Sequence, residues 1–528
     1  MMEDMCNRSR YLLVLCCSSL SLFFGFSNCS SENKSINDGD HLTGEQLARI
    51  HCGSCHQYSV PERLDKKTWR EQVLPHMAYR LGVKDPAPPT RFSMREEEQM
   101  RRAGIYPEEP VLDSLAWRKI VDFYYREAPD TLPGQPHKPA THIGLESFSS
   151  QPVDFGLGGD ALTCLLHWEA EQELLYAGDG RNELFRLNAA GEIVDRFRLQ
   201  SPPLDVHVDE DGGVYILAVG YFHPNDTPRG QLYYLTPEGQ LERLLNQLPR
   251  PVDMEFADLD GDGREDFVLC GFGHYNGRLS WYRNLGNRQF EEQVLVNTPG
   301  AIKTYLLDFN DNGQTDILTL MAQGDERILV HYNNGDGSFR EERLLRFDPV
   351  FGSIYFEPVD YDADGDLDLL YVNGDNADYS IRLKPYHGIR LYENDGNNQF
   401  SEAFFFPLHG AFKAQPVDFD ADGDLDIAAI AFFPDYEKAP EESFLYLENM
   451  TDKTGEAFDF APATFEENPR GRWITMESGD FNGDGAPDIA LGSFTFSPSP
   501  APVAQQSQWE KEPLNVLLLK NGQAGSEE

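Results

Sequence analysis

The stretch Asp258-Leu-Asp-Gly-Asp-Gly-Arg-Glu-Asp266 decides the fold of this 528-residue chain, because its pattern of alternating acidic residues recurs four more times. The later copies begin at Asp308, Asp360, Asp418 and Asp480, at intervals of about 50 to 60 residues. Each copy lies between two apolar, strand-like runs, and in most copies a third run ends in an Asn-Gly or Asn-x-Gly turn. This period predicts one four-stranded propeller blade per copy.

Two further blades are predicted upstream, over residues 162–197 and 205–245, where strand-like runs occur without a complete acidic loop. Together with the five acidic copies they make seven blades. The segment 144–148 is expected to supply a strand to the last blade and close the ring, which removes an open sheet edge. We therefore predict a mainly β protein with a seven-bladed β-propeller over residues 143–523, followed by a tail at 524–528.

The acidic loops are candidate calcium sites, because alternate positions of a tight loop direct oxygen atoms inward while a glycine permits the sharp turn. The expected ligands are Asp258, Asp260, Asp262, the carbonyl of Arg264 and Asp266; Asp308, Asn310, Asn312 and Asp316; Asp360, Asp362, Asp364 and Asp368; Asp418, Asp420, Asp422 and Asp426; and Asp480, Asn482, Asp484 and Asp488. Up to five structural Ca²⁺ ions are predicted. The second loop has only two carboxylates among its ligands and should bind most weakly or be empty.

These five loops resemble the FG-GAP or VCBS-type repeats of integrin-α-like propellers, and the likeness spans most of the chain. The loops at the opposite end of such a propeller are rich in histidine, tyrosine and carboxylate side chains. They contain His223, His274, Tyr275, Asp375, Tyr386, His387, His409, Asp435 and Arg472. Their convergence predicts a ligand site at the propeller mouth. The alternative is that each residue packs within its own loop.

A second motif, Cys52-Gly-Ser-Cys55-His56, lies far upstream of the repeats. Two thiols at this spacing bind the vinyl groups of a haem covalently, while the adjoining histidine reaches the iron. A helix is predicted to begin at the capping box Thr43-Gly-Glu-Gln46, and an amphipathic helix to contain Trp117 and Tyr124 and to end at Pro129. Residues 41–128 therefore resemble a small α-helical class I c-type cytochrome domain carrying one haem c.

Met77 is the preferred sixth ligand of that haem, because it follows an apolar run that ends at Pro75, a proline expected to break the helix. Met94 and Met100 are alternatives within a strongly charged helix, and Met77 could instead have only a packing role. A thioether ligand raises the reduction potential, so this haem would accept electrons from a substrate-oxidising partner.

The N-terminus predicts export, because Arg8 and Arg10 precede an apolar stretch over residues 11–26. Residues 1–29 are interpreted as a signal peptide or lipoprotein signal, with Cys29 as the lipidation site and 30–40 as a polar tether. Ordinary cleavage near residues 27–30 is the alternative. The predicted location is the periplasm or, through a lipid anchor, the outer membrane of a bacterium. A proline-rich linker over 129–142 joins the two domains.

The amino-acid composition argues against polyanionic partners. The chain has 44 basic and 88 acidic residues, a formal net charge of -44, which repels nucleic acids and anionic lipid surfaces. Its eight cysteines show no spacing typical of a disulfide framework, and Cys164 and Cys270 lie in apolar strand-like runs where an inert thiol is expected.

Three functions remain open from the sequence. The first is an exported mono-haem electron-transfer protein with a redox partner, whose propeller binds a protein or an extracellular saccharide. The second is a periplasmic dehydrogenase that oxidises a sugar or alcohol at the propeller mouth, with the haem as electron acceptor and a quinone as a possible cofactor. The third is a polysaccharide lyase or hydrolase. No complete catalytic motif is present to support an enzyme.

Overall fold

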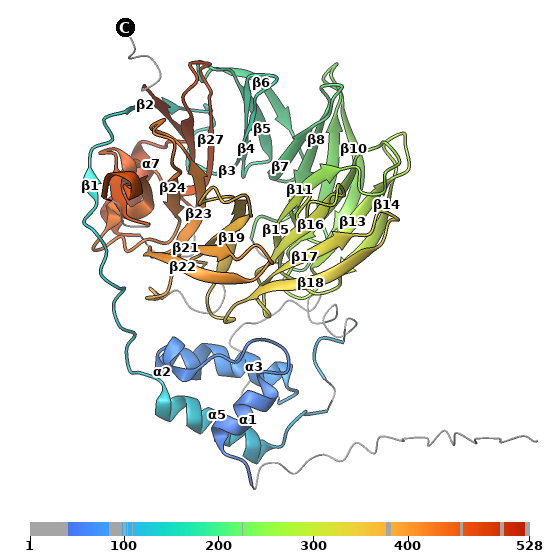
Figure 1. The fold of residues 1–528 in the computed structure, drawn as a ribbon, viewed down its shortest axis with the longest axis vertical. Helices are drawn as coiled ribbons and strands as arrows, with labels where there is room; N and C mark the ends of the chain where they lie inside the picture. Colours follow the sequence, from blue (N-terminus) through green and yellow to red (C-terminus); the bar gives the residue numbers. More distant parts are fainter. Residues whose placement is uncertain are drawn as a thin grey trace, which may run out of the picture. The chain divides into compact units, whose positions relative to one another are not determined.

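The computed structural model describes residues 41–83, 98, 102, 104–107, 109–223, 225–375, 382–454, 458–496 and 501–522 (Figure 1). All of them belong to one compact unit, Asp38–Glu528. Cys29, Met94 and Met100 lie outside the described residues. Among the described helices, none has the length and apolar character needed to cross a membrane.

The N-terminal part of this unit is helical. It contains α1 (Gly44–His51), η1 (Pro61–Arg63), α2 (Lys66–Thr68), the π-helical turn η2 (Trp69–Val73), α3 (Leu74–Arg80) and α5 (Ser114–Glu127). The predicted capping box is present, since the Thr43 hydroxyl accepts from the amide of Gln46 and the Gln46 side chain accepts from the amide of Thr43. The apolar face of α5 buries Trp117, Ile120 and Tyr124 against α1 and η2.

Pro75 does not break the helix before Met77, contrary to the expectation from sequence. It lies in the first turn of α3, directly after the π-helical turn Trp69–Val73. A proline is tolerated at this position because the wider turn and the start of a new helical segment do not require its missing N–H group. Met77 is therefore a helical residue.

The described strands form seven sheets around a central axis, which makes a seven-bladed propeller (Figure 1). Blade 1 contains β3 (Thr163–Glu169), β4 (Leu174–Asp179), β5 (Glu183–Leu187) and β6 (Ile193–Arg198); blade 2 contains β7 (Pro203–Val208), β8 (Val214–Ala218), β9 (Gly230–Leu235) and β10 (Leu241–Leu248). Blade 3 contains β11 (Pro251–Ala257), β12 (Asp266–Gly271), β13 (Arg278–Asn284) and β14 (Phe290–Val296); blade 4 contains β15 (Ala301–Leu307), β16 (Asp316–Met321), β17 (Arg327–Asn333) and β18 (Phe339–Arg346).

The remaining blades contain the last three acidic loops. Blade 5 contains β19 (Ser353–Val359), β20 (Asp368–Asn373), β21 (Gly388–Asn394) and β22 (Phe400–Pro407); blade 6 contains β23 (Ala411–Val417), β24 (Asp426–Ala431), β25 (Phe444–Asn449) and β26 (Phe460–Thr464), with β1 (His142–Ile143) parallel to β26. Blade 7 contains β27 (Trp473–Gly479), β28 (Asp488–Ser493) and β29 (Val516–Asn521). Short helices η3 (Pro440–Ser443), α6 (Thr451–Thr454), η4 (Asn468–Arg470) and α7 (Val503–Lys511) lie in the connections of the last two blades.

An N-terminal strand closes the ring, as predicted from the sequence. The closing strand is β2 (Phe148–Val153), which pairs antiparallel with β29 of blade 7 from Phe148–Asn521 to Val153–Val516. It begins later than the expected segment 144–148, because the amide of Phe148 donates to the carbonyl of Leu145 and bends the preceding residues into a turn. Pairing of β2 with β29 fixes both ends of the propeller and gives blade 7 four strands.

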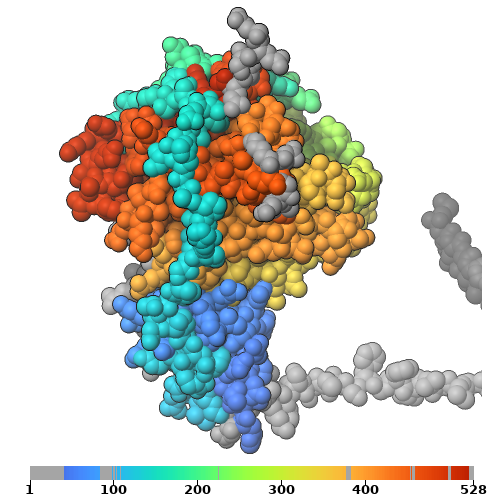
Figure 2. Space-filling model, turned by 60° about the vertical axis from the view of Figure 1, so that its left-hand side comes forward, coloured from blue at the N-terminus to red at the C-terminus, as the bar shows by residue number. Residues whose placement is uncertain are grey.

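Residues 129–142 run along the outside of the propeller (Figure 2). Lys138 donates to the carbonyl of Pro407 at 2.8 Å and to the buried carboxylate of Glu442 at 2.7 Å, and Gln135 donates to the carbonyl of His387 at 3.0 Å. The predicted linker is thus bound to blades 5 and 6 by polar contacts.

Candidate functional site

The Cys-x-x-Cys-His motif begins at the C-terminal end of α1. Cys52 is half-buried and Cys55 exposed, and neither thiol is in a disulfide. Burial raises the pKa of Cys52 to about 11, so this side chain stays a neutral thiol. The His56 ring approaches the carbonyl of Gln57 through Nδ1 at 2.7 Å, which leaves Nε2 as its second ring nitrogen. A histidine that ligates a metal through Nε2 is commonly oriented by such a contact at Nδ1. These residues fit the attachment of a haem c.

Two candidate axial side chains follow on α3. Met77 is half-buried and packs, like Cys52, against the apolar cluster formed by Leu47, Trp69 and Trp117. Its neighbour His76 is only 6% exposed, and burial lowers its pKa to about 4. A neutral imidazole is itself a good metal ligand, so the structure adds His76 as a competitor that the sequence argument did not consider.

The helical segment contacts the propeller through Arg63. Its guanidinium forms an ion pair with Asp348 at 3.4 Å and lies over the rings of Phe351 and Tyr386, at 5.1 and 5.4 Å from the centroids. The Tyr386 hydroxyl donates to the carbonyl of Arg63 at 3.0 Å. Val350 packs against the apolar cluster of the helical segment. We call Arg63, Asp348, Val350, Phe351 and Tyr386 the joint.

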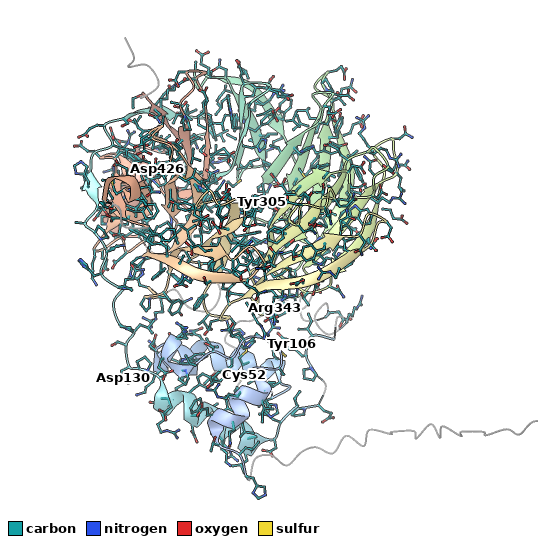
Figure 3. The ribbon with its side chains drawn as sticks, in the orientation of Figure 1. Cys52, Tyr106, Asp130, Tyr305, Arg343 and Asp426 are labelled. Carbon is teal, nitrogen blue, oxygen red and sulfur yellow. The ribbon has the colours of Figure 1, made fainter. Side chains whose placement is uncertain are left out.

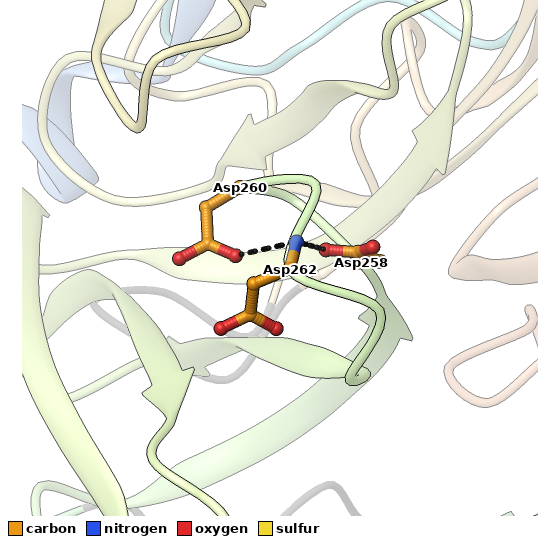
Figure 4. A group of neighbouring side chains, drawn as sticks. All are labelled: Asp258, Asp260 and Asp262. Carbon is orange, nitrogen blue, oxygen red and sulfur yellow. Dashed lines mark hydrogen bonds between the residues drawn. The ribbon is translucent and has the colours of Figure 1, made fainter.

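The first acidic loop gathers three carboxylates within reach of one ion. Ligand oxygen atoms of Asp258, Asp260 and Asp262 lie within 4.8 Å of one another, and the amide of Asp262 donates to both other carboxylates (Figure 4). Gly263 has φ +83°, a conformation that other residues rarely adopt. Among the described residues, equally close groups occur in the third loop, with Asp360, Asp362 and Asp364, and in the fourth, with Asp418, Asp420 and Asp426.

Two arginines compete for the first loop. Arg283 of β13 forms an ion pair with Asp260, and Arg264 forms one with Asp262. A cavity of about 540 Å³ opens beside them and is lined by Asp260, Arg283 and the buried ring of Trp281. A calcium ion entering this loop would have to displace both guanidinium groups, a competition that the third loop does not show among its described ion pairs.

The ninth residue of every acidic loop is a buried aspartate that connects two parts of its blade by hydrogen bonds. Asp266 accepts from the amide of Leu259 with one oxygen and from the amide of Asn284 with the other, at 3.3 and 2.7 Å. The same pair of bonds is made by Asp316, Asp368, Asp426 and Asp488. In each blade the second amide belongs to the asparagine that ends the third strand. This role was not foreseen when these aspartates were interpreted only as ligands.

The histidine-rich loops all lie at the end of the propeller opposite the acidic loops. They connect the second strand of a blade to the third, as in the β12–β13 loop with His274 and Tyr275, or one blade to the next, as with His409. Antiparallel order places both kinds of connection at one end of the blades. His223 is exposed there, and His274, Asp375, His409 and Asp435 are half-buried.

Three members of this set are not available to a ligand, which corrects the predicted mouth site. His387 is fully buried, and Tyr386 is 8% exposed within the joint. Arg472 is 1% exposed, donates to the carbonyl of Phe432 and lies 4.4 Å from the centroid of its ring. Arg472 also lies over the ring of Phe433, and the Tyr386 ring stacks on that of Phe351. For these residues packing, the alternative weighed above, is the observed role.

An inner ring of mainly polar residues was missed by the sequence argument. It consists of the third and fifth residues of the seven innermost strands: Leu165, Asp205, Asp253, Lys303, Tyr355, Lys413 and Thr475, and His167, His207, Glu255, Tyr305, Glu357, Gln415 and Glu477. Figure 3 shows Tyr305 in the middle of the propeller. Aligning the strands that precede the acidic loops would have exposed these repeated polar positions. The fourth residue of each of these strands is buried and is apolar in six of them, the exception being Thr304 of β15.

Lys303 forms ion pairs with two carboxylates of the inner ring. Its ammonium contacts Asp253 at 2.8 Å and Glu255 at 3.0 Å. Burial alone would lower the pKa of Lys303, but Asp253 and Glu255 hold it well above its ordinary value. Next to it the hydroxyls of Tyr305 and Tyr355 lie 3.0 Å apart, and Tyr355 donates to Glu357. The innermost strands are thus joined by paired polar groups, most of which are half-buried.

Comparison with known proteins identifies the repeats. An FG-GAP-like repeat matches twice, over residues 258–319 and 308–371. No curated protein matches the chain in sequence. Similar solved structures include the N-terminal domain of Nup159 (11% identity, 73% of this chain and 98% of that one, TM-score 0.41) and the Neurospora crassa Pan2 WD40 domain (10% identity, 72% and 97%, TM-score 0.43). The C-terminal WD40 domain of Sif2 has 14% identity over 68% of this chain and 80% of that one, with a TM-score of 0.38. The chain therefore contains FG-GAP-like repeats within a seven-bladed β-propeller.

Proposed function

We propose that this chain is an exported electron-transfer protein, in which the helical segment carries one covalent haem c and the propeller is a scaffold for a partner. The observation that carries the proposal is the geometry of His56, whose Nδ1 is engaged by the Gln57 carbonyl beside two free thiols. Cys52 and Cys55 would hold the haem, His56 would be one axial ligand, and Met77 the other. The haem supplies a one-electron redox centre.

The propeller half of the proposal rests on its FG-GAP-like repeats. A propeller of this kind suggests a protein-interaction scaffold, and a redox protein or an extracellular saccharide is the partner we propose. Calcium in the acidic loops would stabilise this scaffold. Export, and attachment through Cys29, complete the proposal on the basis of the sequence alone. The dehydrogenase and hydrolase hypotheses depended on mouth residues, of which His387 and Arg472 are buried.

Haem attachment is tested with protein produced in cells that contain c-type maturation machinery. We expect the mass of the purified chain to increase by one haem, and the double variant Cys52→Ala/Cys55→Ala to lack it. Met77→Ala should then remove the methionine-to-iron absorption band at the red edge of the oxidised spectrum. Absence of that band from the wild-type protein, with a bis-histidine spectrum that His76→Ala changes and Met77→Ala does not, would assign the ligand to His76. A chain that never acquires haem under these conditions would disprove the proposed function.

A further inference from the structure

The first acidic loop has two arginine side chains where the third and fourth loops have carboxylates. Arg264 is the seventh residue of this loop, and Arg283 precedes the asparagine that ends β13. The corresponding positions of the other two loops are acidic: Asp366 and Glu393 in the third loop, and Asp424 and Glu448 in the fourth. The charge is therefore reversed at both positions.

The seventh positions of these three loops are equivalent in backbone structure. In each loop the amide of the seventh residue donates to the carboxylate of the fifth, at 3.1 Å for Arg264, 2.9 Å for Asp366 and 3.2 Å for Asp424. The second position is equivalent as well, because in each blade it precedes the asparagine whose amide donates to the buried ninth aspartate. The first loop thus differs from the other two in charge and not in backbone arrangement.

Both guanidinium groups bind carboxylates that a calcium ion would need. Arg283 forms an ion pair with Asp260, whose side chain is 7% exposed, and lies 3.8 Å from Asp262. Arg264 forms an ion pair with Asp262 and also donates from Nε to the carbonyl of Asn284 at 2.9 Å. The two arginines therefore connect the loop to the end of the third strand of its blade.

The two guanidinium groups bring the charge that a calcium ion would bring. Together they carry two positive charges, and arginine is not deprotonated in proteins. Ca²⁺ needs about six to eight oxygen ligands, and its affinity depends on the number of charged ligands that a loop offers. The first loop offers calcium fewer free carboxylates than its sequence suggests, since Asp260 and Asp262 are already paired.

We propose that Arg264 and Arg283 take the place of Ca²⁺ in the first loop, so that calcium binds selectively to loops in which both positions are acidic. The inference rests on the proposed function, in which calcium stabilises the propeller, and it names the residues that decide which loops are filled. Blade 3 then keeps its loop structure without calcium. Blades 5 and 6 depend on the ion.

The test is calcium binding by the full-length chain after bound metal has been removed with a chelator. Arg264→Gln/Arg283→Gln should bind one more calcium ion than the wild-type protein in titration calorimetry, because the carboxylates of the first loop become free to bind it. Terbium luminescence locates that ion, since Trp281 lines the cavity beside Asp260 and Arg283 and can sensitise a lanthanide in the loop. Adding Trp281→Phe should remove the emission that the double variant gains.

A reciprocal variant and a matched control complete the design. Asp366→Arg/Glu393→Arg introduces both arginines into the third loop and should remove one calcium ion. Arg278→Gln/Arg340→Gln also removes two positive charges, but from arginines that pair with glutamates outside the acidic loops. This control should bind as many ions as the wild-type protein.

The inference is wrong if the double arginine variant gains no ion, or if the control gains one too, since a gain in both would be a general effect of net charge. If the double variant does not fold, retention of every calcium ion by the reciprocal variant overturns the inference. Wild-type protein that binds no calcium at all would overturn the calcium-stabilised scaffold of the proposed function, and this inference with it.

Discussion

Glu326 is a carboxylic acid that the fold keeps almost wholly away from water. It is 3% exposed, accepts from the amide of Ser353 at 2.9 Å and lies beside the hydroxyl of that residue. Burial raises the pKa of Glu326 from 4.5 to about 8, although Ser353 opposes the shift. The carboxyl group is therefore protonated in the folded protein at neutral pH, while it is ionised in the unfolded chain.

This pKa difference predicts a pH-dependent stability. Between about pH 4.5 and 8 the folded state binds a proton at Glu326 that the unfolded state has lost, so the stabilising contribution is complete below 4.5 and disappears as pH rises through 8. In Glu326→Gln an amide replaces the protonated acid, and that slope should be absent. Urea unfolding of both proteins across this range measures the difference. Parallel stability curves would contradict the assigned pKa.

At the scale of elements, the aspartate at the ninth position of each acidic loop connects the start of that loop to the end of the third strand of the same blade. Asp316 shows this most clearly, because its loop is the one with the fewest carboxylates for calcium. It is fully buried and accepts from the amides of Phe309 and Asn333 and from the side chain of Asn310. Each acceptor oxygen satisfies a backbone donor that is closed off from water.

Asp316→Asn should therefore destabilise the propeller, since the new amide group faces a backbone N–H and leaves it unpaired. A buried donor without a partner costs about 1–3 kcal/mol. The matched control is Asp308→Asn at the half-buried first position of the same loop, where a smaller loss is expected. Chemical unfolding of both variants in excess chelator excludes any contribution from calcium. Equal losses of stability would mean that the buried hydrogen bonds of Asp316 contribute no more than those of Asp308.

Calcium is expected to stabilise the propeller through particular loops, because an ion that binds only the folded state shifts the unfolding equilibrium. Chelation should lower the melting temperature of the propeller. Asp360→Asn in the third loop should remove more of this calcium-dependent stabilisation than Asp308→Asn in the second, since three carboxylates converge only in the former. Metal analysis should show fewer ions in the first variant. Protein purified without chelator that contains no calcium would refute the prediction.

At the scale of the whole molecule, the inner ring joins neighbouring blades through partly buried charges. Lys303→Met should leave the buried carboxylate of Asp253 and the half-buried one of Glu255 without their cation and destabilise the propeller, by less than the roughly 3–5 kcal/mol lost when a fully buried ion pair is broken from one side. The triple variant Lys303→Met/Asp253→Asn/Glu255→Gln should recover much of this stability, because no unpaired charge remains. Thermal unfolding compares the two. A triple variant as unstable as the single one would show that Lys303 acts by packing and not by charge.

Features that depend on short sequence patterns could be predicted from the amino-acid sequence. The capping box at Thr43, the repeat period and the closure of the ring by an early strand all follow from short-range patterns that the fold keeps. Pro75 was misjudged because the π-helical turn before it depends on packing of Trp69, which no local pattern shows. Similarly, His387 and Arg472 lie in ordinary loop sequences, and nothing local in those sequences shows that both side chains are buried.

The sequence by itself predicted about seven blades and showed the acidic loops and the Cys-x-x-Cys-His motif, since repeat spacing and turn chemistry are properties of contiguous residues. The tertiary structure alone decided which polar groups meet. Asp253 and Lys303 come from different blades, and Arg63 and Asp348 are separated by most of the chain, yet each pair lies within 4 Å. Such contacts depend on how blades and helices pack, because the free energy of burying a charge is set by its spatial neighbours and not by its neighbours in sequence.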